Sequence, residues 1–213
     1  MATAERTHVE RTTAERTPYA EAARELLRET LLDAARDELE RRGWAQITMG
    51  DIAAAAGVSR QTLYKEFGSR EAFAQTFVLR ESDRFLLTVE QAVGEHLDDP
   101  ATALSAAFNV FLTAAAEDPL VRTLLTGDET HSLLALLTTQ GEPVVAGATE
   151  RLAAIILAGW PQVNPADASL LAECLVRLAI SYAALPAGPT GMTAASVTTL
   201  LGPYIERVLN PAR

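Results

Sequence analysis

From Pro18 onward, the apolar residues of the chain recur at helical spacing. In the first segment, from about Pro18 to Arg42, they fall every four positions, at Leu27, Leu31, Ala35 and Leu39. That period places them on one face of an α-helix, and Gly43 is a natural stop. The pattern of the remaining chain predicts helices near 49–55, 60–67, 70–95, 101–116, 119–125, 129–139, 143–158, 165–185 and 194–209. We therefore expect an all-α fold.

The amino-acid composition excludes several classes of protein. Apolar residues make up 48% of the 213 residues and aromatic residues 6%, which is typical of a globular, helix-rich chain. The single cysteine, Cys174, excludes an internal disulfide and a zinc site built on clustered cysteines. Prolines and glycines interrupt the charge-free run 178–205, so we do not expect a membrane span. No secretory signal opens the chain, and we expect a soluble cytoplasmic protein with no metal and no cofactor.

Charge is distributed unevenly along the chain. The net charge is −10; residues 1–75 carry 11 basic and 13 acidic side chains, and residues 76–213 carry 7 and 15. Within Arg41–Arg70 the balance reverses, with five basic side chains and two acidic ones, a local net charge of +3. Contacts with a polyanion depend on the local patch and not on the sum over the chain. This pattern favours a protein that contacts nucleic acid at one end only.

The segment from Met49 to Gly68 has the residues that a helix-turn-helix requires. Thr48 and Ser59 are placed to cap two short helices, because their hydroxyl groups can accept hydrogen bonds from free backbone amides. Ala53 is the small residue where the two helices cross, and Gly57, four residues later, provides the positive φ angle of the turn. The alternative is that this turn simply joins two packed helices.

The second helix of this segment presents polar residues that fit a DNA major groove. Near its N-terminus, Arg60 can pair with guanine and Gln61 with adenine. Residues further along the helix suit phosphate and the flanking backbone. With the helix N-termini and the start of the next helix added, the predicted DNA contacts are Thr48, Ser59, Arg60, Gln61, Thr62, Tyr64, Lys65, Ser69 and Arg70.

A resemblance to a known family is carried by Asp51–Phe73, DIAAAAGVSRQTLYKEFGSREAF. With Ala-Gly-Val-Ser at 56–59, Thr-Leu-Tyr at 62–64 and Ser-Arg-Glu at 69–71, it resembles the DNA-binding domain of the TetR family of transcriptional regulators. The resemblance implies a TetR-like homodimer with a three-helix DNA-binding domain at 18–68 and a ligand-binding and dimerisation domain at 69–213. Glu66 departs from the family pattern, and we expect its carboxylate to turn aside or to pair with Lys65 or Arg70.

Residues 1–17 precede the first helix and show no apolar periodicity. We expect them to form a disordered arm. The alternative is an arm that enters a DNA groove through its arginines, Arg6, Arg11 and Arg16. The glutamates between these arginines weaken that alternative.

The last two predicted helices carry apolar stripes with alternating spacings of four and three residues. Two such helices per subunit can form a four-helix interface across a two-fold axis, although the same stripes could belong to the core of one subunit. The predicted interface residues are Leu171, Leu175, Leu178, Tyr182, Val197, Leu201, Tyr204 and Val208. A two-fold dimer predicts a near-palindromic operator on double-stranded DNA.

A ligand site is expected among the helices of the C-terminal half. Apolar residues should surround a central cavity there, and one histidine could orient a polar group of the ligand. The predicted lining residues are Phe85, Phe108, Phe111, Leu112, His131, Leu137, Leu152, Ile156, Trp160 and Cys174. Each of them could instead be ordinary core. Because few charged residues interleave with them, we expect a small apolar effector.

These patterns together predict a ligand-responsive, sequence-specific DNA-binding regulator, in the first instance a repressor that its effector releases from the operator. The expected mechanism is a population shift, in which the effector binds the state that does not fit DNA more tightly. Two alternatives stay open: a regulator of the same fold that is controlled by a partner protein or acts as an activator, and a small-molecule-binding or catalytic helical protein. The chain has no phosphate-binding glycine loop and no nucleophile elbow, so we do not expect an enzyme.

Overall fold

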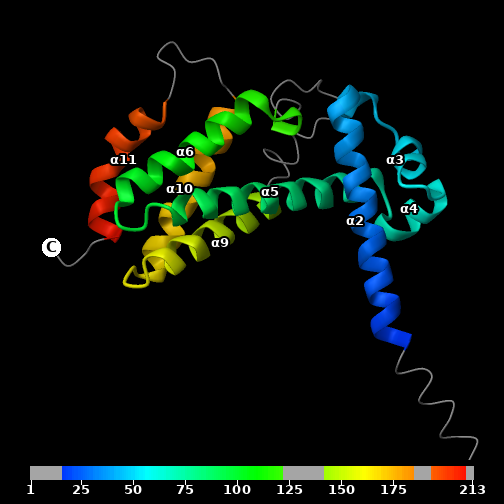
Figure 1. Cartoon of the computed structure of the whole chain (residues 1–213), viewed down its shortest axis with the longest axis horizontal. Coiled ribbons are helices and arrows are strands. Elements are labelled where there is room, and N and C mark those ends of the chain that lie inside the picture. The colour runs from blue at the N-terminus through cyan, green and yellow to red at the C-terminus, as the bar shows by residue number, and fades with distance from the viewer. Residues whose placement is uncertain (1–15, 122–141, 185–192, 210–213) are drawn as a thin grey trace, which may run out of the picture. The chain divides into compact units, whose positions relative to one another are not determined.

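The computed structural model describes residues 16–121, 142–184 and 193–209, and the statements below refer to these ranges (Figure 1). They contain helices and no strand, so the predicted all-α fold is confirmed. In chain order the elements are α2 (Arg16–Arg42), the 3-10 turn η1 (Trp44–Gln46), α3 (Met49–Ala55), α4 (Arg60–Phe67), α5 (Arg70–Gly94), α6 (Pro100–Glu117), α9 (Glu142–Gly159), α10 (Pro165–Ala184) and α11 (Ala194–Leu209). Within these ranges, no helix is both long enough and apolar enough to cross a membrane.

The predicted helix boundaries agree closely with the structure. The bounds of α3, α4 and α11 coincide with the predicted ranges. Those of α5 and α10 differ by one residue at the C-terminal end, and those of α6 and α9 by one residue at each end. Helix α2 begins at Arg16, two residues before the predicted start, because its first turn accommodates Pro18 without losing a backbone hydrogen bond. The rest of the predicted arm lies outside the described residues. The predicted helices 119–125 and 129–139 lie wholly or largely outside them.

The chain divides into two compact units. One unit holds the described chain up to Arg42 together with Gln46–Arg70; the other holds Gly43–Ala45 and the described chain from Glu71 onward. The first unit contains α2, α3 and α4, with α3 packed against both neighbours. Its core is formed by fully buried aliphatic side chains, Leu31, Leu39, Ile47, Ile52 and Leu63.

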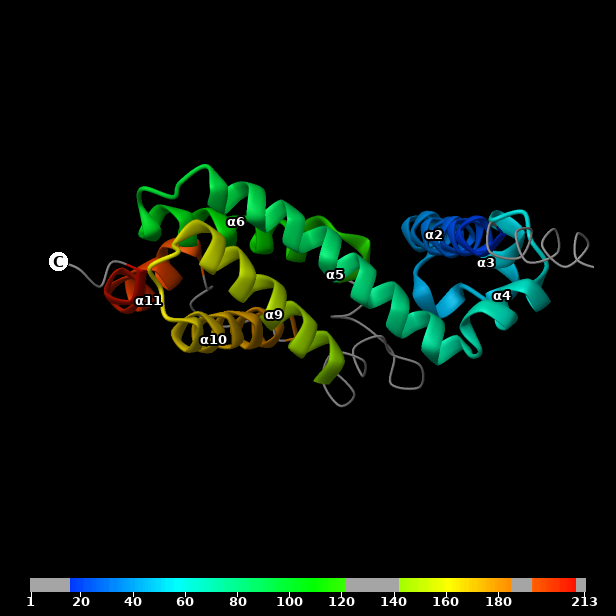
Figure 2. The same ribbon diagram turned by 90° about the horizontal axis from the view of Figure 1, so that it is seen from below.

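The second unit is a helical bundle with one continuous hydrophobic core. Helix α9 packs against α10, and α11 packs against α6. Figure 2 shows α9 running beside α5, and the ion pair between Arg151 and Glu90 joins these two helices at 2.7 Å. At the end of the bundle, the indole nitrogen of Trp160 donates a hydrogen bond to the carbonyl oxygen of Leu97 at 3.1 Å. Trp44 also belongs to this unit, because its ring stacks on Phe77 of α5 with centroids 5.6 Å apart.

The predicted interface residues of α10 and α11 differ in how far the single chain buries them. Leu171 and Val197 are buried in the core of the single chain, with 4% and 2% of their surface exposed. Tyr182 packs edge-on against Phe111 of α6. The other predicted interface residues are partly buried and pack against the same core; they are Leu175, Leu178, Leu201, Tyr204 and Val208. Neighbouring helices of the same chain thus cover Leu171 and Val197, and the interface through these stripes stays a prediction.

Candidate nucleic-acid interface

A complete capping box starts helix α3. The hydroxyl group of Thr48 accepts a hydrogen bond from the backbone N–H of Asp51 at 3.2 Å and donates one to the Asp51 carboxylate at 2.7 Å. The same carboxylate accepts a hydrogen bond from the backbone N–H of Thr48 at 2.8 Å. These bonds satisfy amides that would have no partner at the helix start, and the predicted N-cap is confirmed. Because the single hydroxyl proton of Thr48 is used by Asp51, this hydroxyl could donate to a phosphate only by leaving the carboxylate.

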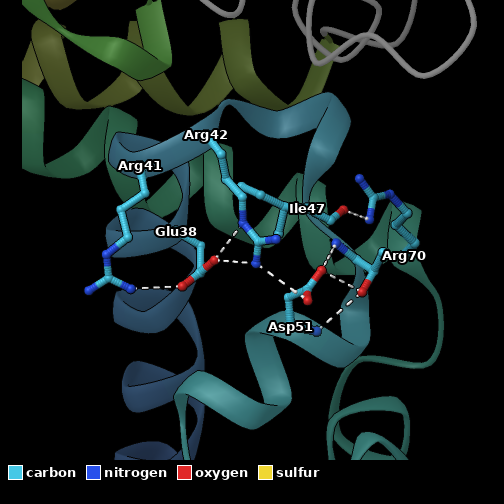
Figure 3. A network of polar contacts seen from close by, with 7 residues as sticks. Glu38, Arg41, Arg42, Ile47, Asp51 and Arg70 are labelled. Carbon is cyan, nitrogen blue, oxygen red and sulfur yellow. Dashed lines mark hydrogen bonds and ion pairs between the residues drawn. The ribbon is translucent and has the colours of Figure 1, made fainter.

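A network of charges joins the end of α2 to this cap (Figure 3). Arg42 lies between Glu38, to which its Nε donates at 2.8 Å, and Asp51, whose carboxylate lies 3.3 Å from its Nη2. Arg41 donates to the second oxygen of Glu38 at 2.8 Å. Hydrogen bonds from the Thr48 side chain, above all, hold the pKa of Asp51 below its ordinary value, and the hydrogen bond from Arg42 does the same for the pKa of Glu38. Both carboxylates are therefore charged at neutral pH and hold the guanidinium of Arg42 between them.

The turn between α3 and α4 is a Schellman motif. The backbone N–H of Val58 donates to the carbonyl of Ala53 at 2.9 Å, and that of Gly57 donates to Ala54 at 3.1 Å. Gly57 has a φ angle of 71°, as the sequence predicted. Ala53 is buried where α3 meets α4, which also agrees with the predicted close crossing of the two helices.

Helix α4 carries its polar residues on an accessible surface. Ser59 caps it by accepting a hydrogen bond from the backbone N–H of Thr62 at 3.0 Å, and the two hydroxyl oxygens lie 2.8 Å apart. Only one of the two hydroxyl protons is needed for that contact, so the other can point to a phosphate. Arg60 donates to the Tyr64 hydroxyl at 3.4 Å and lies over its ring. The exposed residues of this helix include Arg60, Gln61 and Lys65, while Thr62 and Tyr64 are half-buried.

The side chains of Arg70 and Glu66 make other contacts in the structure than the sequence predicted. Arg70 donates a hydrogen bond to the carbonyl oxygen of Ile47 at 2.6 Å, so part of its guanidinium ties the start of α5 to the segment before α3 (Figure 3). Glu66 does not pair with Lys65 or Arg70. Its carboxylate accepts a hydrogen bond from Nε of Arg24 in α2 at 2.6 Å, because the last turn of α4 packs beside the early turns of α2. The expectation that Glu66 turns aside is confirmed, and the predicted partner is wrong.

Sequence reasoning missed the residues of α2 that hold this surface. The apolar period of the first helix assigned no role to Arg24 or Arg28. In the structure Arg28 donates to the backbone carbonyl of Glu66 at 3.2 Å and its guanidinium lies 4.5 Å from the centre of the Phe67 ring. The partners are 38 and 42 residues apart in the chain, and no local pattern links them.

Aromatic rings from three helices gather in the second unit, among the residues predicted to line a ligand site. Phe111 of α6 makes edge-on contacts with Phe85 of α5 at 6.4 Å, with Phe108 at 5.7 Å and with Tyr182 of α10 at 5.9 Å between ring centroids. Phe108, Ile156 and Trp160 are buried, and Leu112 and Leu152 are partly buried against the same core. Among the described residues, no group of three or more His, Cys, Asp or Glu side chains is placed to hold a metal ion.

Three other ligand-site predictions have different outcomes. Cys174 was predicted to line the ligand site, but its side chain is exposed on α10. His131 and Leu137 lie outside the described residues.

Two family matches cover most of the described chain. Residues 31–76 match the family described as bacterial regulatory proteins, tetR family, and residues 99–203 match the family described as bacterial tetracyclin repressor, C-terminal domain. The chain belongs to the TetR family. The first match spans the capped helices α3 and α4, so the TetR-like helix-turn-helix predicted from the sequence is confirmed, and the chain is a DNA-binding transcriptional regulator.

Individual relatives place the chain within the TetR family. The HTH-type transcriptional regulator AlkX of Mycobacterium tuberculosis (strain ATCC 25618 / H37Rv) is 42% identical over 192 residues, 90% of this chain and 91% of that protein. The crystal structure of the TetR family repressor AlkX from Dietzia sp. strain DQ12-45-1b, implicated in biodegradation of n-alkanes, is 36% identical, with a TM-score of 0.75 over 86% of this chain and 97% of that one. A TetR-family regulator from Pectobacterium atrosepticum, 22% identical, shares the fold with a TM-score of 0.61 over 90% of this chain and 98% of its own.

Proposed function

We propose that this chain is a repressor that binds a near-palindromic operator as a homodimer and leaves it when a small apolar effector binds. The observation that carries the proposal is helix α4, which we call the recognition helix: its exposed face carries Arg60 and Lys65, and the Schellman turn and the Ser59 cap fix its start. The similarity to the AlkX repressors supports the same function. We infer that the chain acts by binding and not by catalysis, in the cytoplasm, where its DNA target lies.

The proposed base contacts come from the first turn of α4. Arg60 can give two hydrogen bonds to guanine, and Gln61 can do the same for adenine. Lys65, Tyr64 and the Ser59–Thr62 hydroxyl pair are proposed to contact phosphates. Thr48 and Ser69 are proposed to contribute chiefly through the backbone at the helix starts, and Arg70 through its tie to Ile47 as well as any contact with DNA.

Selection of bound duplexes from a random DNA pool tests this proposal. The purified full-length chain should enrich a near-palindromic sequence, and binding of that duplex should weaken steeply as salt is raised. Replacing both Arg60 and Lys65 with alanine should abolish preferential binding of the selected duplex. A chain that enriches no sequence would contradict the proposal.

A matched pair of substitutions controls for charge alone. Arg36 lies on α2 and Arg177 on α10, and each makes an ion pair with a glutamate four positions away in its own helix. Replacing both with alanine removes the same total charge as the α4 variant but leaves the recognition helix intact. This control variant should retain most of the affinity for the selected duplex.

The effector is proposed to be an apolar molecule with a hydrocarbon chain. The rings of Phe85, Phe108 and Phe111 lie in the core of the second unit, and the AlkX repressor from Dietzia is implicated in biodegradation of n-alkanes. An apolar ligand gains free energy mainly by leaving water for such surroundings.

A release assay tests this choice of effector. Straight-chain alkanes and alcohols of increasing length are added to the protein–operator complex, with a short dicarboxylate as a charged control. The apolar compounds should release DNA and raise the melting temperature of the free protein, because a ligand that binds the folded state stabilises it. Release by the dicarboxylate alone would contradict an apolar site.

The dimer is proposed to form through the outward faces of α10 and α11. Leu170 of α10 and Leu200 of α11 are 54% and 75% exposed, which is unusual for leucine and typical of contact surfaces. Replacing both with glutamate should convert the dimer to a monomer in light scattering without loss of helical circular dichroism. A variant that stays dimeric would place the interface elsewhere.

A further inference from the structure

Two arginines of α2 hold the last turn of the recognition helix. Nε of Arg24 donates to the carboxylate of Glu66 at 2.6 Å, and one turn later Nη1 of Arg28 donates to the backbone carbonyl of the same residue at 3.2 Å. The guanidinium of Arg28 also lies over the ring of Phe67, the last residue of α4. We call these three side chains, Arg24, Arg28 and Glu66, the α2–α4 clamp.

The clamp lies at the C-terminal end of α4. Helix α4 has only eight residues, and the Schellman turn and the Ser59 cap both lie at its start. At its other end, the backbone N–H of Gly68 donates to the carbonyl of Tyr64 at 2.8 Å and that of Ser69 to the carbonyl of Phe67 at 3.0 Å. A carboxylate such as that of Glu66 is unfavourable beside the carbonyl groups of a helix end. Arg28 satisfies one of these carbonyls, and Arg24 compensates the charge of Glu66, whose side chain is only 13% exposed. The hydrogen bond to Glu66 raises the pKa of Arg24, so this guanidinium stays charged.

We propose that Arg24, Arg28 and Glu66 are positioning residues that set how accurately the recognition helix reads bases. They act through α4 and do not contact DNA themselves. The inference rests on the proposed operator binding. Hydrogen bonds to base edges require the helix to lie in one orientation, whereas long basic side chains can still reach phosphates after a small rotation. Loss of the clamp should therefore reduce sequence preference more than it reduces non-specific binding.

The salt dependence of binding separates positioning from direct contact. Each phosphate contact made by a basic side chain releases counterions and contributes about −0.9 to the slope of log K against log salt. If Arg24 touched a phosphate, its removal would make the slope shallower by about that amount. If it only positions α4 through Glu66, the slope stays the same while the affinity for the operator falls.

The test compares the full-length wild type with Arg24→Gln on two duplexes, the operator selected by the wild type and a scrambled sequence of equal length. Fluorescence anisotropy is measured over a series of salt concentrations. We expect roughly a tenfold loss of operator affinity, the size of one weakened base contact. Affinity for the scrambled duplex and both slopes should be unchanged. Arg24 is 60% exposed, so the variant is expected to fold.

Arg36→Gln is the matched control, because it breaks an ion pair within the same helix and removes the same charge. It should leave the ratio of operator to scrambled affinity unchanged. An Arg24→Gln variant that behaves like Arg36→Gln, or that makes the slope shallower by about 0.9, would overturn the inference.

A double-mutant cycle tests whether the charges act as a pair. Arg24→Gln combined with Glu66→Ala should lower the affinity ratio no more than Arg24→Gln alone, because both changes remove the same contact. Arg24→Lys, which can still reach Glu66, should retain most of the ratio. Losses that add, or an Arg24→Lys variant as weak as Arg24→Gln, would contradict the proposed pair. A wild type that selects no duplex would instead refute the proposed function itself.

Discussion

Gly57 is the residue on which the turn between α3 and α4 depends. Its φ angle of 71° lies in the left-handed region, where a side chain meets the backbone, although the space around it is open. The cost of a substitution would therefore come from backbone conformation and not from a clash with neighbours.

Gly57→Ala should destabilise the protein by about 1–2 kcal/mol, the cost of forcing alanine into the left-handed conformation. The free energy of unfolding is measured by urea titration. Gly94→Ala provides the control, because Gly94 ends α5 with an ordinary φ angle and open space around it. That change should be neutral or slightly stabilising. Equal losses for both variants would show that the turn does not depend on the φ angle of Gly57.

Asp51 gives the stability of the DNA-binding unit a predictable pH dependence. Hydrogen bonds from Thr48 lower the pKa of Asp51 in the folded state, below the ordinary value of 3.8. A carboxyl group with a depressed pKa stabilises the fold above its unfolded-state pKa, and this contribution is lost as the pH falls through the folded-state pKa. Asp51→Asn should therefore be less stable than wild type at pH 7, and the difference should shrink below about pH 4. A difference that stays constant down to pH 2 would contradict this assignment.

One face of helix α4 stabilises the fold, and the opposite face is accessible for recognition of DNA. Leu63 is fully buried, and Lys65, two positions later, is exposed. The face with Leu63 therefore contributes to the core of the unit, and the face with Lys65 is accessible to a binding partner.

Leu63→Ala should cost about 2–5 kcal/mol of unfolding free energy, because it leaves a cavity in a small core. Lys65→Ala should change stability by less than about 0.5 kcal/mol and should reduce the salt slope of operator binding by about 0.9. Denaturant titration and anisotropy measure the two effects. If Lys65→Ala leaves the slope unchanged, Lys65 does not contact phosphate.

At the scale of the whole molecule, the proposed homodimer requires two recognition helices, related by a two-fold axis, to reach the same side of the duplex. Half-sites of the operator should then lie one helical turn or a multiple apart, at about 10–10.5 base pairs per turn. Inserting five base pairs between the selected half-sites should abolish tight binding, and inserting ten should restore part of it. Equal binding of both altered duplexes would show that the chain reads each half-site independently.

Much of the fold and of the candidate site could be predicted because it depends on local chemistry. Hydroxyl groups at Thr48 and Ser59 predict helix starts, Gly57 predicts the turn, and the four-residue period predicts the buried face of α2. These features involve neighbours within one or two helical turns, so the sequence order alone brings them together. The resemblance to the TetR family, carried by the same local motif, implied the regulatory role and supported the DNA contacts and the dimer.

Long-range contacts were not predictable in the same way. Apolar periodicity shows which residues share a face of α10 or α11, but not which helix covers that face. The sequence therefore left two possibilities for Leu171 and Val197, an interface with a partner subunit or the core of one subunit, and helices of the same chain bury them. Cys174 was assigned to the interior for the same reason, and it is exposed.

The sequence by itself determined the helices, their caps and the polar surface of the recognition helix, because hydrogen bonds and side-chain spacing within a few residues decide them. Only the tertiary structure decided that Arg24 and Arg28 hold Glu66, that Arg70 is tied to Ile47, and which faces of the last two helices remain open. Those outcomes depend on how separate helices pack. The packing of helices depends on how side chains fit together throughout the unit, so the order of residues along one helix does not determine which helices lie against each other.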